Sequence, residues 1–171
     1  MSQAGISLRA ELTYLGRFSR PPNASVNTEV IYHRVGNTPI ALKISLNRRH
    51  IIDGPDMART LLQTQVSLRR YIARYYRADE DVLFPSDDPY TSSEANTGCF
   101  FGVTHFPENL PKRLTYGMVE SILTGVFDVL YRGNLYVAAD ILMIHDNMGM
   151  VGFGRVTKDR PGQWVQSVAV E

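Results

Sequence analysis

The sequence predicts an α+β fold: a two-layer sandwich of about six mostly antiparallel strands with two helices on one face. Three observations carry this prediction. Short runs of alternating or β-branched residues recur along the chain, two longer runs repeat apolar residues every three or four positions, and the elements follow the order β, ββ, α, β, α, ββ. Two helices that are each apolar on one side can cover a single face of a sheet.

The strand predictions come from local patterns. Residues 6–16 alternate apolar and polar side chains, as in a half-buried strand. Residues 28–35 and 38–46 flank Gly36-Asn37, which indicates a hairpin, and CFFGVTHF at 99–106 indicates a further strand. The last hairpin is expected at 135–145 and 150–157, closed around the turn that begins at Asp146.

The two helix predictions rest on boundary signals as well as apolar stripes. The start of the first helix is indicated by Asp53, Gly54 and Pro55, which provide an N-cap candidate and a proline at or near the first helical position. This helix extends to about Arg77. The second follows Pro111 and ends before Gly133, which occupies the position expected of a left-handed C-terminal residue.

Length and composition predict a single domain. The 171 residues are enough for one core, with a flexible loop at about 79–97 and a tail at about 159–171 that either adds an edge strand or trails loosely. The net charge of +1 argues against nucleic acid as a partner, and no apolar run is long enough to predict a membrane span. The single Cys99 and a polar-apolar N-terminus without a signal peptide favour the cytoplasm over secretion.

The strand at 135–145 is apolar at both parities, which predicts a central strand that is covered on both faces. Asp140 would then be a carboxylate in or near the core and would need a partner. It is either a catalytic acid or base, or a structural group that is paired with Arg155 or another arginine. His145 and Asp146, at the end of the same strand, fit a role in the turn better than a catalytic one.

The remaining histidines, His33, His50 and His105, lie on separate segments. No close pair of metal-ligand residues exists in the sequence, so no metal and no other cofactor is expected. A lone imidazole can nevertheless transfer a proton near neutral pH. His33 and His105 are therefore catalytic candidates beside Asp140, each weighed against a surface or core role.

Candidate substrate-binding residues are three tyrosines and one arginine. Tyr32, Tyr116 and Tyr136 could polarise a substrate oxygen. Arg48 lies in an Arg-Arg-His cluster before the first helix and could hold an anionic group, although a solvated strand end has the same composition. Gly152 and Gly154, and likewise Gly117 and Gly125, indicate close packing or a recess for a ligand.

Residues 114–133, LTYGMVESILTGVFDVLYRG, precede a strand that contains Asp140 and then GMVGFGRV. This layout, over Leu114 to Val156, resembles small, mostly uncharacterised fungal proteins in which an aromatic residue followed by glycine opens a helix that leads into a closing hairpin. The resemblance implies a fungal source and transfers no active-site residue.

Two functional hypotheses follow from these patterns. The first is a cofactor-independent isomerase, cyclase or dehydratase that acts on an apolar metabolite between sheet and helices, as in secondary metabolism, with the small molecule as its partner. The second is a non-catalytic interaction protein, effector-like or a homodimer built from exposed sheet edges.

Overall fold

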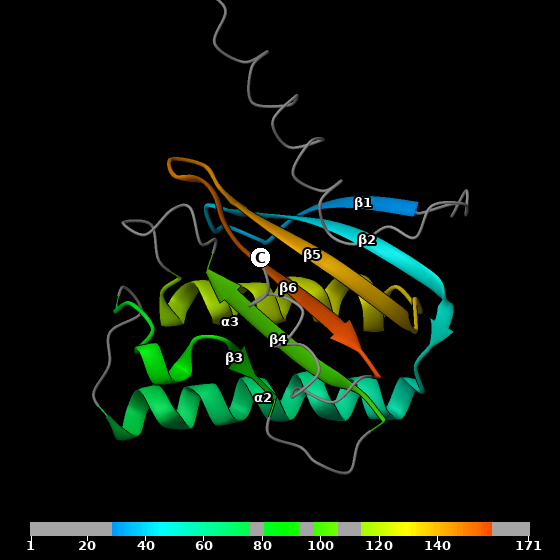
Figure 1. Ribbon diagram of the computed structural model, residues 1–171, viewed down its shortest axis with the longest axis horizontal. Helices are drawn as coiled ribbons and strands as arrows, with labels where there is room; N and C mark the ends of the chain where they lie inside the picture. The colour runs from blue at the N-terminus through cyan, green and yellow to red at the C-terminus, as the bar shows by residue number, and fades with distance from the viewer. Residues whose placement is uncertain (1–28, 76–80, 93–97, 106–113, 159–171) are drawn as a thin grey trace, which may run out of the picture.

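The computed structural model describes residues 29–75, 81–92, 98–105 and 114–158. These residues form one six-stranded sheet in the order β1-β2-β5-β6-β4-β3, and every neighbouring pair of strands is antiparallel. The two helices, α2 and α3, lie on the same side of this sheet (Figure 1). The predicted α+β sheet-and-helix architecture is confirmed. The strand predicted at 6–16 and the tail at 159–171 lie outside the described residues.

The first hairpin joins β1 (Glu29–Arg34) to β2 (Ile40–Ile51). Its turn is closed by Thr38, which donates its backbone N–H (3.0 Å) and its hydroxyl (2.7 Å) to the carbonyl of Val35. Gly36 takes φ of 43°, a value that glycine adopts without strain. β2 continues five residues past the predicted Leu46, because it also pairs with the central strand through a register shift after Asn47.

Helix α2 spans Gly54–Arg74 and begins at the predicted cap. The Asp53 side chain accepts the N–H of Asp56 at 3.3 Å, and Pro55 occupies the first turn. The described helix ends three residues before the predicted Arg77. Its buried face includes Met57, Leu61 and Leu68.

Helix α3 spans Tyr116–Val126 and continues as a π-helical segment, η3 (Phe127–Arg132). Thr115 caps its start by accepting the N–H of Met118 at 3.2 Å. The predicted end before Gly133 is confirmed, but the predicted left-handed residue is not: Gly133 has φ of −77°, and Asn134 has φ of 55°. Glycine is needed at 133 for space, since a Cβ there would lie 2.2 Å from the carbonyl oxygen of Val129.

The closing hairpin consists of β5 (Val137–His145) and β6 (Gly149–Thr157), and β6 pairs with β4 (Phe100–His105). The short strand β3 (Tyr90–Thr91) and a 3-10 turn, η1 (Pro85–Asp87), fall within the stretch predicted to be a long loop. Sequence patterns missed both because two or three residues do not establish a period.

The core lies between the sheet and the two helices. Ile40, Leu42, Ile44 and Leu46 of β2 alternate with less buried residues and point to the helices. Close backbone approach tightens this layer: a Cβ on Gly125 of α3 would meet Val35 at 2.6 Å and Leu42 at 2.8 Å. For Gly125, close packing is therefore the correct interpretation.

The glycines of β6 are also packing positions. A Cβ on Gly152 would lie 2.5 Å from the carbonyl oxygen of Thr104, and a Cβ on Gly154 would lie 2.7 Å from the Val103 side chain. Both glycines allow strand β4 to approach closely.

Candidate functional site

We call residues 81–92 the strap. In space, this segment connects the first residues of α3 with the β3–β4 edge of the sheet. At one end, Leu83 donates its N–H to the carbonyl of Leu114 (2.9 Å), and Asp81 accepts the N–H of Tyr116 (3.0 Å). At the other end, Tyr90 lies opposite Val103 of β4. These pairings place the middle of the strap beside both the last residues of β4 and the first residue of α3.

Asp88 of the strap binds the end of β4 through both carboxylate oxygens. Oδ1 accepts the hydroxyl of Thr104 at 2.7 Å and the backbone N–H of His105 at 3.3 Å, and Oδ2 contacts the imidazole Nδ1 of His105. The Asp88 side chain is only 9% exposed and that of His105 is 23% exposed. A carboxylate on Nδ1 orients the imidazole with that nitrogen protonated, which leaves Nε2 to exchange a proton with another molecule.

Asp87, the preceding residue, binds the start of α3. The hydroxyl of Tyr116 donates to Asp87 Oδ2 at 2.7 Å and accepts the N–H of Phe84 at 3.4 Å. Burial raises the pKa of Tyr116 above its usual value, and the hydrogen bond to Asp87 acts in the same direction. The Tyr116 ring also stacks at 5.6 Å on Tyr71 of α2.

Tyr90 of β3 lies close to the carboxylate of Asp87 and follows Asp88 by two residues in the strap. Burial, and then the nearby charge of Asp87, raises the pKa of Tyr90 to about 12, so its hydroxyl stays protonated at neutral pH. In the β3–β4 pairing, His105 is two residues beyond the partner of Tyr90 on the same face. That diagonal is within reach of an aromatic side chain. We call Asp87, Asp88, Tyr90, His105 and Tyr116 the strap cluster.

The structure separates His105 from His33, the other predicted catalytic histidine. They occupy the two ends of one row across the sheet, in which each residue lies directly opposite the next: His33, Leu42, Met143, Gly152 and His105. Four strand spacings of about 4.8 Å put them roughly 19 Å apart. Within the described part of the chain, His33 Nε2 is buried without a hydrogen-bond partner.

Asp140 lies on the face of the sheet that carries no helix in the described part of the chain, which we call the open face. It pairs across the strands with Ser45 and Arg155, and its Oδ1 accepts a hydrogen bond from Arg155 Nε at 2.6 Å. Its side chain is 62% exposed, so the prediction of a carboxylate in or near the core is wrong. The predicted structural partner, Arg155, is confirmed. The prediction was wrong because it relied on the apolar neighbours of Asp140 along β5. Leu142 and Ala138 are buried on the same face of β5, whereas Asp140 between them is exposed.

The other predicted substrate-binding residues are spread over the surface. Tyr32 is exposed on β1, and its ring lies 5.8 Å from Lys43 Nζ. Arg48 is bound to Glu29 at the far end of the first hairpin. The Tyr136 hydroxyl donates to Asn134 at 2.8 Å, and the Tyr136 ring packs against Gly54 at the start of α2. Of the residues predicted to form a site, the structure therefore brings only His105 and Tyr116 together, through the adjacent Asp87 and Asp88.

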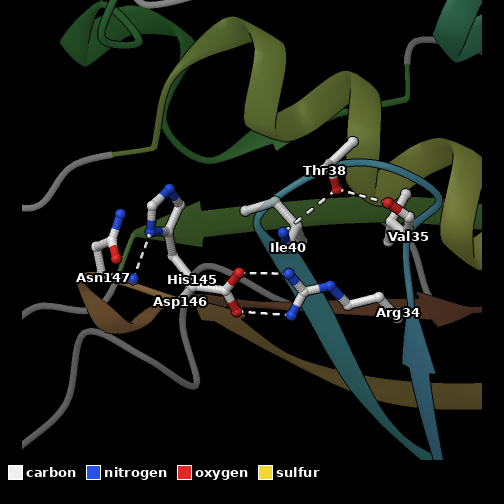
Figure 2. Close-up of polar contacts among 7 residues, drawn as sticks. All are labelled: Arg34, Val35, Thr38, Ile40, His145, Asp146 and Asn147. Carbon is white, nitrogen blue, oxygen red and sulfur yellow. Dashed lines mark hydrogen bonds and ion pairs between the residues drawn. The ribbon is translucent and has the colours of Figure 1, made fainter.

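Figure 2 shows that His145 and Asp146 belong to the turn, as expected. Asp146 binds the Arg34 guanidinium with both carboxylate oxygens, and His145 Nδ1 accepts the N–H of Asn147 at 3.2 Å. The Arg34 bond lowers the pKa of the Asp146 carboxyl. This pair links the β5–β6 turn to the end of β1.

Sequence reasoning missed Asp87 and Asp88. Both lie within the loop predicted at about 79–97, and that prediction gave neither carboxylate a partner. The available signal was the dipeptide Asp87-Asp88 before Pro89, but nothing local indicates that its two carboxylates face different elements.

The described residues provide neither a metal site nor a reactive thiol. Within residues 29–75, 81–92, 98–105 and 114–158, no group of three or more His, Cys, Asp or Glu could hold a metal ion. Burial raises the pKa of the Cys99 thiol to about 12, which disfavours the reactive thiolate. No helix in the described part of the chain is long and apolar enough to cross a membrane.

Comparisons with known proteins add no functional information. No protein-family model matches the sequence, and no curated protein or solved structure matches it. The functional assignment therefore rests on the geometry of the strap cluster.

Proposed function

We propose that this chain is a cofactor-independent enzyme that transfers a proton on an apolar small molecule, in the isomerase, dehydratase or cyclase class, and that His105 is its proton-transfer residue. The observation that carries the proposal is the contact of Asp88 Oδ2 with His105 Nδ1. A carboxylate that holds one imidazole nitrogen is the arrangement that general acid–base enzymes use to orient the other nitrogen.

In this proposal Asp88 is a positioning residue. Its other oxygen is held by Thr104 and by the backbone of His105, so the carboxylate cannot rotate away from the imidazole without losing two hydrogen bonds. Both side chains, Asp88 and His105, have low exposure, so water competes less for their contact. Low exposure also strengthens the electrostatic interaction between the two groups.

Tyr90 is the proposed donor to a substrate oxygen. Its raised pKa keeps the proton on the phenol, and its diagonal relation to His105 places a donor and a base on one face of the sheet edge. Such a pair suits a substrate with an ionisable C–H next to a carbonyl or a leaving hydroxyl. Asp87 and Tyr116 hold the strap against α3 and so position this edge.

The surroundings of the cluster favour a substrate that is largely apolar. Aromatic rings of Tyr71 and Tyr116 line the strap side, and the side chain of Leu114 lies beside Gly152, directly opposite His105. A fungal source, a role in secondary metabolism and a cytoplasmic location belong to the same proposal.

Deuterium exchange tests the proposal without knowledge of the natural substrate. The protein would be incubated in D2O with a panel of apolar carbon acids, such as α,β-unsaturated and β-hydroxy ketones, and incorporation would be followed by NMR. We expect wild-type protein to accelerate exchange on at least one class, and His105→Gln to lower the rate on the order of 100-fold or more.

Two variants make this test specific. His50→Gln removes an exposed histidine outside the cluster and should leave exchange unchanged. Asp88→Asn keeps an oxygen for Thr104 but turns an N–H₂ towards Nδ1, which favours the opposite imidazole tautomer. Nitrogen-15 shifts of His105 should report that change in tautomer alongside a slower exchange. If the panel shows no exchange, or if His105→Gln exchanges at the wild-type rate, the enzyme proposal is wrong.

The second candidate function is a homodimeric interaction protein. The observation that favours it is the exposure of Val30 and Tyr32 on the edge strand β1.

A further inference from the structure

Strand β1 forms one border of the sheet. In the part of the chain that the structure describes, β2 is its only strand neighbour, so the outer side of β1 carries unpaired backbone groups. Proteins usually protect such an edge with charges, proline or a covering segment, because it can add a further strand. Here Val30 is 40% exposed and Tyr32 is 70% exposed on that edge strand.

The turn after β1 shows which backbone groups face outward. Val35 donates its N–H to Ile40 of β2 at 3.0 Å. Because the N–H and C=O of successive residues point to alternate sides of an antiparallel strand, Ile31 and His33 also bond to β2. The N–H and C=O groups of Val30 and Tyr32 therefore point away from the sheet.

We propose that two copies of this chain pair through β1, antiparallel, about a two-fold axis at Ile31. The two sheets would join edge to edge, with the helices of both copies on one side. Val30 and Tyr32 of each copy would exchange backbone hydrogen bonds with the partner's Tyr32 and Val30, because these are the residues with outward groups.

This register brings compatible residues opposite one another at positions 29–33. On the open face, Val30 lies against the partner's Tyr32, a β-branched and aromatic pair of the kind that stabilises sheets. On the helix side, Ile31 lies against its own copy. Glu29 lies directly opposite the partner's His33, so a carboxylate and a histidine are paired twice across the axis.

Glu29 can still accept a hydrogen bond across the axis when its ion pair within the chain is intact. Arg48 donates both of its hydrogen bonds to Oε2 of Glu29, which leaves Oε1 for a further donor. A register shifted by one residue per strand, with Tyr32 opposite itself, places Val30 against the partner's Arg34 and Ile31 against the partner's His33. Those pairs match less well, so the axis at Ile31 is preferred.

A cysteine at the axis tests the register. Ile31→Cys would place two thiols in a pair without backbone bonds, with Cα atoms about 4.5 Å apart, within the range of a disulfide. With an added oxidant, we expect rapid covalent dimerisation of this variant. Ile51→Cys is the matched control, because Ile51 is 66% exposed on β2 beyond the end of the β1 pairing and should crosslink slowly. The native Cys99 is buried and should not contribute.

A lysine at the edge tests the interface itself. Light scattering after size exclusion should show a dimer for wild type, and Tyr32→Lys should raise the dimer dissociation constant at least about tenfold, since the added charge acts twice. Ile51→Lys adds the same charge outside the interface and should leave the dimer intact.

Three results would overturn the proposal. They are a wild-type protein that is monomeric at every concentration, as when another segment of the same chain covers β1; equal crosslinking of the two cysteine variants; or a dimer that Tyr32→Lys does not weaken. The deuterium-exchange test of His105 is independent of these outcomes, because β1 and the β3–β4 edge lie at opposite borders of the sheet.

Discussion

Asp88 accepts hydrogen bonds from Thr104 and from the backbone of His105 with one carboxylate oxygen, while its other oxygen contacts the His105 imidazole. These contacts connect the strap to the last two residues of β4. They make Asp88 a structural residue as well as the proposed positioning residue.

Truncation of this side chain should therefore destabilise the fold. Asp88→Ala leaves the hydroxyl of Thr104 and an N–H without their acceptor in a largely buried place, and we expect a loss of about 1–3 kcal/mol in the free energy of unfolding. Urea denaturation would measure it. Ser86→Ala, an exposed change in the same strap, should stay within about 0.5 kcal/mol of wild type. Equal losses for the two variants would contradict the role of Asp88.

The buried tyrosines predict a loss of stability at alkaline pH. The pKa values of Tyr90 and Tyr116 are raised in the folded protein, so above about pH 10 the unfolded chain releases phenol protons that the folded chain retains. The stabilisation is complete below pH 10 and is lost as pH rises to about 12 for Tyr90, and higher for Tyr116. Denaturation midpoints between pH 9 and 12 should fall less steeply for Tyr116→Phe than for wild type. Parallel curves would show that Tyr116 does not titrate as described.

Gly125 should not tolerate a methyl group. Its Cβ would meet Val35 and Leu42 at less than 3 Å, so we expect Gly125→Ala to cost about 1–3 kcal/mol through overpacking. Adding Val35→Ala removes one of the obstructing side chains. In a double-mutant cycle, the combined cost should be smaller than the sum of the single costs. Additive costs would indicate that the α3–β2 contact is looser than described.

The ion pair on the open face should matter little for stability. The side chains of Asp140 and Arg155 are 62% and 41% exposed, and exposed ion pairs contribute about 0–1 kcal/mol. Asp140→Asn should therefore unfold within about 1 kcal/mol of wild type, with the difference shrinking in high salt. A loss of several kcal/mol would instead support the buried carboxylate that the sequence pattern predicted.

The turn pair gives a titration prediction in acid. Because Arg34 lowers the pKa of the Asp146 carboxyl, this group stays ionised below the usual value of 3.8. The stabilisation it supplies is present above that value and is lost as pH falls through the lower, folded-state pKa. NMR titration of the carboxyl carbon should show a midpoint below 3.8 in wild type that rises in Arg34→Gln. An unchanged midpoint would exclude the pair in solution.

The sequence by itself determined the elements that have a period or a boundary signal. The apolar repeat and the cap at Asp53 predicted α2, and the alternation around Gly36-Asn37 predicted the first hairpin, because helix and strand periods and turn preferences act between residues that are close in the chain. The pairing of Asp140 with Arg155 was one of two alternatives drawn from the sequence, but the burial from which it was argued is absent, because the Asp140 side chain is 62% exposed.

Only the tertiary structure decided which polar groups meet. Asp88 and His105 are 17 residues apart, and they come together because a two-residue strand aligns the strap with β4. His33 and His105 look alike in the sequence, yet His33 lies on the border strand β1 and His105 on β4, beside the opposite border strand β3. Strand order and long-range register depend on packing summed over the whole core rather than on any local pattern, so the composition of a site follows from the fold and not from the spacing of its residues.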